Sequence, residues 1–146
     1  MPTRTARTAW NGSLQQGSGQ VELSSSHVGT YEVSFPKRAA EDAGGTTSPE
    51  ELIAAAHSAC YAMQLSAIVA EAGGTPHALD VRADVSLGPD PAGGFRLTGI
   101  LLTVRGEVDG LDAAGFEQAA QAAKAGCPVS KALTGVEITL DAGLES

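Results

Sequence analysis

The chain contains two cysteines, Cys60 and Cys127, which lie 67 residues apart in a sequence of 146. A thiolate attacks peroxides and disulfides and also binds metals, so two thiols in one chain can form a redox pair or part of a metal site. A cysteine on an apolar helix can equally be an inert core residue. The chemistry therefore depends on the groups around the two sulfurs.

Activation of Cys60 requires help from elsewhere in the chain. Cys60 falls near the middle of an Ala-rich helical segment, too far from its N-terminus for the helix dipole to lower the thiol pKa. Arg38 is the closest candidate cation in sequence, and Lys37 stands beside it. A guanidinium keeps its charge when desolvated and can hold a carboxylate through two parallel hydrogen bonds. We therefore expect Arg38 to pair with Glu50 and to act on Cys60, although a basic pair on a Gly-rich loop is ordinarily solvated.

The distance between Glu50 and Cys60 limits how they can cooperate. Ten residues separate them, which is about 15 Å along a straight helix. Either Arg38 spans part of that gap, or a second copy of the helix runs antiparallel and brings its own Glu50 near the first Cys60. The small residues of this helix allow close approach of another backbone, and the second option predicts a homodimer with shared sites.

His57 lies one turn before Cys60 and allows two further interpretations. It could act as a base for that thiol, or it could bind zinc together with Cys60 and Cys127. Zinc needs three or four ligands at fixed spacing, and the fourth place would fall to the remote His27 or His77. We favour a partly buried polar residue on a helix flank and expect neither a metal nor a cofactor.

Composition restricts the class of protein. Apolar residues make up 42% of the chain and charged residues 18%, which is typical of one globular domain spanning residues 1–146. The net charge of −8 argues against nucleic acid or an anionic membrane as partner. The first 30 residues have no apolar signal-peptide core, and no stretch is expected to reach the roughly 20 apolar residues of a membrane span. We therefore expect a cytoplasmic protein, in which thiols are usually reduced.

The N-terminal third is expected to form strands and then a loop. Short strands are predicted around Thr3 to Trp10, Val21 to Ser24 and Tyr31 to Phe35, separated by Gly-rich segments. A surface loop is expected from Lys37 to Thr47. The predicted strands therefore lie before the first long helix in the sequence.

That helix has a strong start signal and a clear stop signal. Ser48 fits the N-cap, Pro49 fits the first helical position, and Glu51 completes a capping box. The helix should run to about Glu71 and end at the glycine pair 73–74.

The second half combines a hairpin with helices, so the fold class is α+β. Strict alternation over Leu79–Leu87 predicts a half-buried strand, which pairs antiparallel with a longer strand over residues 95–108. Asp112 caps a helix that runs to about Ala125. Pro128 opens a short helix with Cys127 at its N-cap, and a last strand is expected over residues 136–140.

Two motifs carry a resemblance to a known family. Residues 47–63 read TSPEELIAAAHSACYAM, and residues 123–130 read AKAGCPVS. Together with the early segment AWNG at residues 9–12, they resemble the osmotically inducible protein C (OsmC) family, relatives of the organic hydroperoxide resistance (Ohr) proteins. The similarity spans nearly the whole chain.

The resemblance implies a fold, a reaction and roles for four residues. The implied fold is antiparallel sheets around long central helices in an intertwined two-fold homodimer. The implied activity is a thiol-dependent peroxidase for organic hydroperoxides, with Cys60 as the peroxidatic cysteine, Cys127 as the resolving cysteine, and Arg38 and Glu50 as activating residues. The two cysteines would close a disulfide that an external dithiol or thiol protein reduces. A non-catalytic small-molecule-binding or zinc-binding dimeric module is the alternative.

Overall fold

The computed structural model describes residues 1–145 and has the α+β composition that the sequence predicts. The chain divides into two compact units, Met1–Leu52 and a second unit that begins at Ile53. The boundary falls inside helix α2 (Pro49–Glu71), and each unit contains its own three-stranded sheet. A single domain over residues 1–146 stays a prediction.

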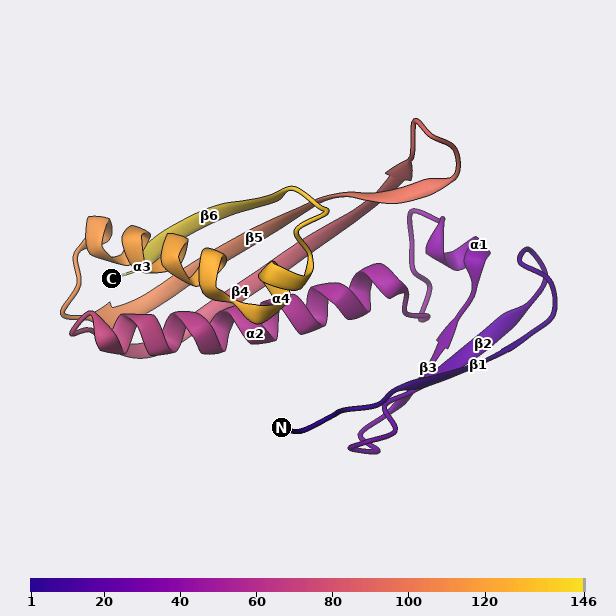
Figure 1. The fold of residues 1–146 in the computed structure, drawn as a ribbon, viewed down its shortest axis with the longest axis horizontal. Coiled ribbons are helices and arrows are strands. Elements are labelled where there is room, and N and C mark those ends of the chain that lie inside the picture. Colours follow the sequence, from indigo (N-terminus) through magenta and orange to yellow (C-terminus); the bar gives the residue numbers. More distant parts are fainter. Residues whose placement is uncertain (146) are drawn as a thin grey trace. The chain divides into compact units, whose positions relative to one another are not determined.

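The sheet of the first unit is antiparallel, with the strands in sequence order. It contains β1 (Arg7–Asn11), β2 (Ser18–Glu22) and β3 (Thr30–Val33), and Figure 1 shows them as the indigo and violet arrows. The three predicted strands are therefore confirmed, although their bounds differ by several residues.

The third strand ends earlier than predicted because a short helix, α1 (Phe35–Arg38), begins at Phe35. The hydroxyl of Ser34 accepts the backbone N–H of Lys37 at 3.3 Å, and Pro36 lies in the first turn. A serine N-cap followed by proline is a helix-start signal, and here it outweighs the β-propensity of the aromatic residue. The expected loop thus begins as a helical turn, with Arg38 at its end.

The start of α2 follows the prediction with one difference. The hydroxyl of Ser48 accepts the backbone N–H of Glu51 at 3.1 Å, as an N-cap should. The carboxylate of Glu51 does not return to Ser48; it accepts the hydroxyl of Thr47 at 2.6 Å. The predicted capping box is therefore half formed, with Thr47 as the partner of the glutamate.

The end of α2 is a Schellman turn. Gly73 has φ of +90°, its N–H donates to Ala70 at 3.1 Å, and the N–H of Gly74 donates to Val69 at 2.9 Å. This pattern satisfies carbonyls that the last helical turn leaves without a partner, and it needs a residue that tolerates positive φ. The predicted stop is confirmed.

The sheet of the second unit is mixed, which corrects the expected antiparallel arrangement. Strand β4 (Thr75–Pro89) pairs antiparallel with β5 (Phe95–Asp109), as predicted, but β6 (Ile138–Glu145) runs parallel to β5. Helices α3 (Ala113–Gly126) and α4 (Pro128–Ala132) connect β5 to β6. A helical crossover returns the chain in its original direction, so the last strand has to be parallel.

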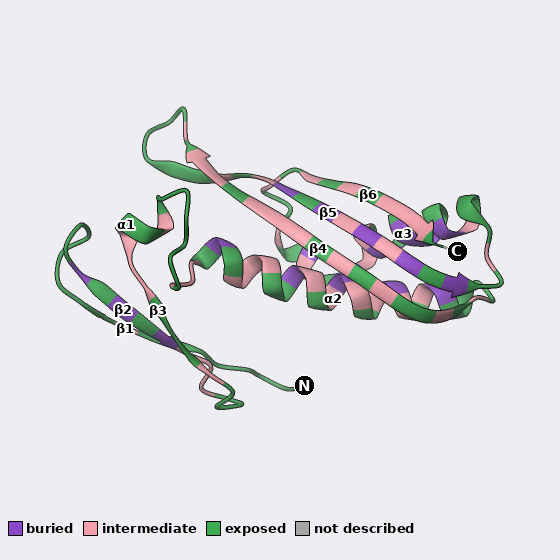
Figure 2. Ribbon diagram, turned by 180° about the vertical axis from the view of Figure 1, so that it is seen from behind, coloured by how far each residue is buried: buried purple, intermediate pink, exposed green. Residues whose placement is uncertain are grey.

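The helices of the second unit cover one face of its sheet. Figure 1 shows them in front of the strands, and Figure 2, seen from behind, shows the strands in front of them. The buried side chains recur every four residues on α2 and every two on β5, as the helix and strand periods require. The core includes Tyr61, Leu65 and Val69 from α2, Ile100, Leu102, Val104 and Val108 from β5, Phe116, Ala119, Ala120 and Ala123 from α3, and Cys127.

Helix α2 is long and apolar, although no stretch of the sequence was expected to reach the length of a membrane span. By length and composition it is the one helix among residues 1–145 that could cross a membrane, and 22% of an 18-residue window is buried. The expectation that no stretch approaches such a length was wrong, because the acidic residues Glu50, Glu51 and Glu71 lie only at the two ends. The core helix of a soluble protein passes the same test, and α2 supplies three residues to the core.

Candidate active site

The two cysteines face each other within the second unit. Cys60 lies on α2, and Cys127 lies between α3 and α4, where it caps both helices. Their sulfur atoms are 3.1 Å apart, and both thiols are free. A disulfide bond is about 2.05 Å long, so this is a reduced pair already in contact. Cys127 is completely buried, whereas Cys60 is partly exposed.

The two thiols differ in acidity. Burial raises the pKa of Cys60, and the backbone N–H of Val129 only partly opposes this effect. Burial also disfavours ionisation of Cys127, but the N–H of Ser130, the Cys60 thiol and the Ser130 hydroxyl together lower the Cys127 pKa. The Cys60 sulfur lies 3.1 Å from that of Cys127, whereas Ser130 makes no cap hydrogen bond to the Cys127 side chain and acts on it electrostatically. Cys127 is therefore the more readily ionised thiol within this unit.

His57 is completely buried, not half-buried on a helix flank as expected. Its Nε2 lies 2.7 Å from the hydroxyl oxygen of Ser130, and burial lowers its pKa. Its Nδ1 has no hydrogen-bond partner among the described residues. The imidazole thus contacts neither sulfur as a base would; it contacts the residue that follows Cys127 by three positions.

Ser130 is the site residue that the sequence analysis missed. It is 6% exposed. Its hydroxyl contacts the imidazole of His57, and its N–H and hydroxyl help to lower the pKa of Cys127. A signal was available, because Cys127 was expected at an N-cap, and the third residue after an N-cap points its N–H back at the cap side chain.

Arg38 and Glu50 form the predicted ion pair within the first unit. The Arg38 Nε donates to Glu50 Oε1 at 2.8 Å, and a terminal guanidinium nitrogen donates to Oε2 at 3.0 Å. Glu50 is 7% exposed, so its carboxylate depends on this bidentate partner. The side chain of Lys37 forms no ion pair in the described part of the chain. Arg38 and not Lys37 is therefore the partner of Glu50 within the described residues.

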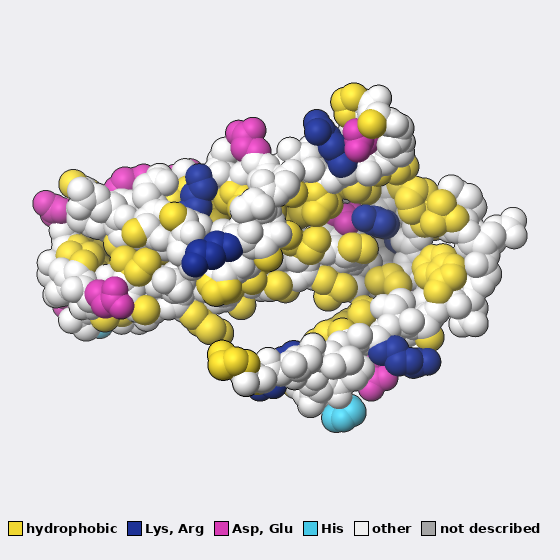
Figure 3. Space-filling view, in the orientation of Figure 1, with side chains coloured by type: hydrophobic (Ala, Val, Ile, Leu, Met, Phe, Trp, Pro, Cys, Tyr) yellow, Lys and Arg dark blue, Asp and Glu magenta, His cyan; other side chains and the backbone are white. Residues whose placement is uncertain are grey.

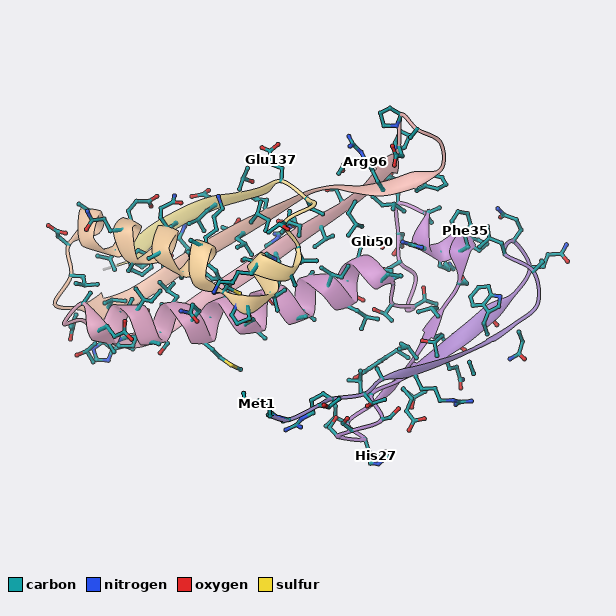
Figure 4. The ribbon with its side chains drawn as sticks, viewed as in Figure 1. Met1, His27, Phe35, Glu50, Arg96 and Glu137 are labelled. Carbon is teal, nitrogen blue, oxygen red and sulfur yellow. The ribbon has the colours of Figure 1, made fainter. Side chains whose placement is uncertain are left out.

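An apolar cavity of about 410 Å³ lies beside this ion pair within the first unit. Figure 4 labels Phe35 at the start of α1 and Glu50 at the start of α2, the two elements that supply part of its wall. Arg38 contributes the charged part of the lining. The apolar lining comes mainly from Trp10, Leu14, Val21, Val33, Phe35 and Leu52.

The histidines and cysteines do not assemble as a metal site would. Within residues 1–145 no group of three or more His, Cys, Asp or Glu side chains could hold a metal ion. His27 lies 3.7 Å from Glu22, and His77 lies 2.8 Å from Asp109. The four predicted site residues instead form two pairs, one in each unit.

These features define an α+β protein with a preformed dithiol and an ion pair at an apolar cavity. A family model described as OsmC-like protein matches residues 41–141. The peroxiredoxin OsmC of Escherichia coli strain K12 is 45% identical over 137 residues, which cover 94% of this chain and 93% of that relative. The organic hydroperoxide resistance protein OhrA of Bacillus subtilis strain 168 is 38% identical over 97 residues, or 65% of this chain and 66% of the relative.

A solved structure shows the same likeness. The crystal structure of the organic hydroperoxide resistance protein OhrB of Bacillus subtilis superposes with a TM-score of 0.75 at 28% identity. The match covers 94% of this chain and 97% of the other. The chain belongs to the OsmC-like family, as its two motifs predicted.

Proposed function

We propose that this protein is a thiol-dependent peroxidase that reduces organic hydroperoxides to alcohols and protects the cell against them. The observation that carries the proposal is the 3.1 Å contact between the free thiols of Cys60 and Cys127. The relatives named peroxiredoxin and organic hydroperoxide resistance protein support the same reaction class. Two thiols in contact can lose two electrons and form a disulfide with little backbone movement.

Cys60 is the residue that meets the peroxide, because it is partly exposed while Cys127 is completely buried. Its thiolate attacks one oxygen of the peroxide, and the O–O bond breaks. The products are a sulfenic acid on Cys60 and an alkoxide, which takes a proton to become the alcohol.

Cys127 then resolves the sulfenic acid. Its thiolate attacks the Cys60 sulfur, the S–O bond breaks, and hydroxide leaves as a disulfide forms. The two protons lost by the thiols match those gained by the alkoxide and the hydroxide, so two thiols and one hydroperoxide give one disulfide, one alcohol and one water. An external dithiol or thiol protein restores the thiols by exchange.

We assign Arg38 and Glu50 to the activation of Cys60. Burial raises the pKa of Cys60, so a nearby cation is needed to favour its thiolate. Arg38 carries a permanent charge, and Glu50 fixes its orientation through two hydrogen bonds. Ten residues of α2 separate Glu50 from Cys60, about 15 Å, so the guanidinium has to bridge part of that distance or come from a second copy of the chain.

The substrate class follows from the apolar cavity beside Arg38. A volume of about 410 Å³ lined by aromatic and aliphatic side chains suits the apolar substituent of an alkyl or aryl hydroperoxide. Hydrogen peroxide has no such group and gains nothing from this lining. We place the reaction in the cytoplasm and the working protein in a homodimer.

Intact-mass analysis and non-reducing peptide mapping test the proposal. The reduced protein is treated with one equivalent of cumene hydroperoxide, with the Cys60→Ser and Cys127→Ser variants alongside. We expect the unmodified chain to lose two hydrogens and to yield a Cys60–Cys127 peptide. Cys127→Ser should stop at a sulfenic acid on Cys60, and Cys60→Ser should not consume peroxide. If both thiols stay reduced in the unmodified chain, the function is instead that of a binding module.

A further inference from the structure

The surroundings of Cys127 contain a buried polar pair that the peroxidase reaction leaves without a role. His57 is 0% exposed and Ser130 is 6% exposed, yet their Nε2 and hydroxyl oxygen lie 2.7 Å apart. A buried polar contact of this kind has to offset the desolvation of both groups. The pair joins α2, which carries Cys60, to α4, which follows Cys127.

The tautomer of His57 fixes the direction of its hydrogen bond. Nδ1 is buried and has no partner in the part of the chain that the structure describes. A hydrogen on Nδ1 would be a donor without an acceptor, which is rarer in proteins than an acceptor without a donor. A protonated imidazole would have the same orphaned donor, and burial lowers the His57 pKa as well. The neutral ring therefore carries its hydrogen on Nε2 and donates to Ser130.

This direction determines what Ser130 offers to the sulfur. Once its oxygen accepts from His57, the hydroxyl hydrogen is free to turn toward another acceptor. Ser130 is the third residue after the N-cap Cys127, where its N–H and side chain face the cap. Neither group forms a cap hydrogen bond to the Cys127 side chain, but both favour the ionised form of its sulfur.

We propose that the His57–Ser130 pair is a buried donor chain in which His57 orients the Ser130 hydroxyl toward the sulfur of Cys127 for the resolving step, with His57 as a positioning residue that acts through Ser130. The inference rests on the proposed peroxidase function and assigns the resolving step to these residues. Without them, only the Cys60 thiol and the Val129 N–H would oppose the burial that disfavours ionisation of Cys127, and a buried un-ionised thiol is unreactive.

The same donors favour a reduction of the disulfide in which Cys60 is attacked and Cys127 leaves. The sulfur of Cys60 is the accessible one, so the thiolate of an external dithiol attacks there and forms a mixed disulfide with Cys60. The bond to Cys127 breaks, and Cys127 leaves as a thiolate. A leaving thiol of lower pKa leaves faster, so stabilisation of this thiolate speeds both halves of the cycle.

Few other titratable groups act on Cys127. From α2 these are the Cys60 thiol, the Tyr61 phenol and His57 through Ser130. The pKa of Tyr61 is raised by burial, by the carboxylate of Glu117 on α3 and by Cys127. On the adjoining helices Lys124 and Lys131 are charged, and neither bonds to the sulfur within residues 1–145. The pH dependence of the resolving step should therefore report on the donor chain.

The test measures closure of the disulfide separately from oxidation of Cys60. Reduced protein is mixed with one equivalent of cumene hydroperoxide between pH 5 and 9, and quenched samples are analysed for Cys60 sulfenic acid and for the disulfide. We expect Ser130→Ala and His57→Leu to slow closure about tenfold at pH 7 and to move its rise to higher pH. Ser130→Ala removes a polar group that favours the ionised sulfur, and His57→Leu removes the hydrogen bond that holds the Ser130 hydroxyl in place. Oxidation of Cys60 is measured in the same samples, so that a change in closure is separated from a change in the first step.

Two conservative variants show whether Ser130 and His57 act as hydrogen-bond donors or only support the packing. Ser130→Thr keeps the hydroxyl, and His57→Gln places an amide N–H near the position of Nε2, so both should restore closure and its pH profile. If Ser130→Ala closes with the pH profile of the unmodified chain, or if the conservative variants fail to restore it, the inference is overturned. If the unmodified chain forms no disulfide at all, the proposed function fails first.

Two further measurements need no substitution at His57 or Ser130, so they test the inference even if those variants do not fold. Nitrogen-15 NMR of the reduced protein should show His57 neutral with its hydrogen on Nε2. Ultraviolet titration of the Cys60→Ser variant should show Cys127 ionising at lower pH in the folded protein than in the same protein unfolded in urea. A hydrogen on Nδ1, or ionisation of Cys127 at the same or higher pH in the folded protein, would overturn the inference.

Discussion

At the scale of residues, the site assigns different tasks to two thiols of the same kind. The accessible Cys60 has a pKa raised by burial, while the buried Cys127 has a pKa lowered by donors around it. The thiol that meets substrate therefore needs a cation, and the thiol that resolves the product carries its own stabilisation. Arg38 and Glu50 are the groups that fit the first need.

Replacement of Arg38 by alanine tests that assignment. Loss of the cation should slow oxidation of Cys60 at pH 7 by about tenfold or more, because one pKa unit changes the thiolate fraction tenfold. The rate of sulfenic acid formation is measured by stopped flow with cumene hydroperoxide. Arg38→Ala combined with Glu50→Gln avoids leaving a buried carboxylate without its partner.

Lys37→Ala is the matched control for this experiment. Lys37 is adjacent in sequence and carries the same charge, but it forms no ion pair among residues 1–145. Its removal should change the rate by less than about twofold through general screening. A larger effect for Lys37 than for Arg38 would transfer the activating role to the lysine.

The buried imidazole predicts a component of the dependence of stability on pH. Burial lowers the pKa of His57 below 6.5, so between those two values the unfolded chain binds a proton that the folded chain does not. Stability should therefore fall as pH decreases below about 6.5, by at most about 1.4 kcal/mol per pH unit from this group. Urea unfolding at pH 7, 6 and 5 should show a shallower decline for His57→Gln.

At the scale of elements, the packing of α3 on β5 depends on one glycine. A Cβ at Gly106 of β5 would lie 2.7 Å from the ring of Phe116, which is 1% exposed. Gly106→Ala should reduce the free energy of unfolding by about 1–3 kcal/mol, because the buried ring would have to shift to make room for the methyl group. Gly135→Ala is the control, since its Cβ would meet nothing within 4 Å and should change stability by less than about 0.5 kcal/mol.

The order of the elements also explains how the two sulfurs meet. Cys60 is fixed by α2, whose ends are set by Ser48 and Gly73. Cys127 is fixed by the junction of α3 and α4, where Asp112 starts the first helix and Pro128 starts the second. Helices α2 and α3 pack on the same sheet, so Cys60 and Cys127 become neighbours although they are far apart in sequence.

At the scale of the whole molecule, α2 is unusually apolar for a helix with so much accessible surface. Only 22% of its 18-residue window is buried, and Met63 is 73% exposed. Figure 3 shows hydrophobic side chains along this part of the second unit. Large exposed apolar surfaces mark association sites, which supports the proposed homodimer.

Light scattering coupled to size exclusion tests the dimer. The unmodified protein should have twice the mass of the chain, and Met63→Lys should shift it toward the monomer because a charge would be desolvated at the interface. Val28→Lys, at a side chain that is 72% exposed, is the control and should leave the mass unchanged. A monomeric unmodified protein would contradict the proposal.

The local elements were largely predictable from the sequence because their signals are short-range. Ser48 and Pro49 start α2, the glycine pair 73–74 ends it, and alternation from Leu79 marks β4. Each of these features depends on residues within a turn or two, where backbone hydrogen bonds and steric limits act. The Arg38–Glu50 pair was also expected, since a guanidinium can hold a carboxylate through two parallel hydrogen bonds.

Tertiary structure decided what depends on residues distant in sequence. The parallel pairing of β6, the contact between Cys60 and Cys127, and the burial of His57 against Ser130 all arise when α2, α3 and α4 pack on one sheet. The sequence by itself determined which thiols and charges are present, where the helices begin and end, and the family to which the chain belongs. It could not determine the acidity of Cys127, because a thiol pKa depends on burial and on donors that only the packed fold brings to the sulfur.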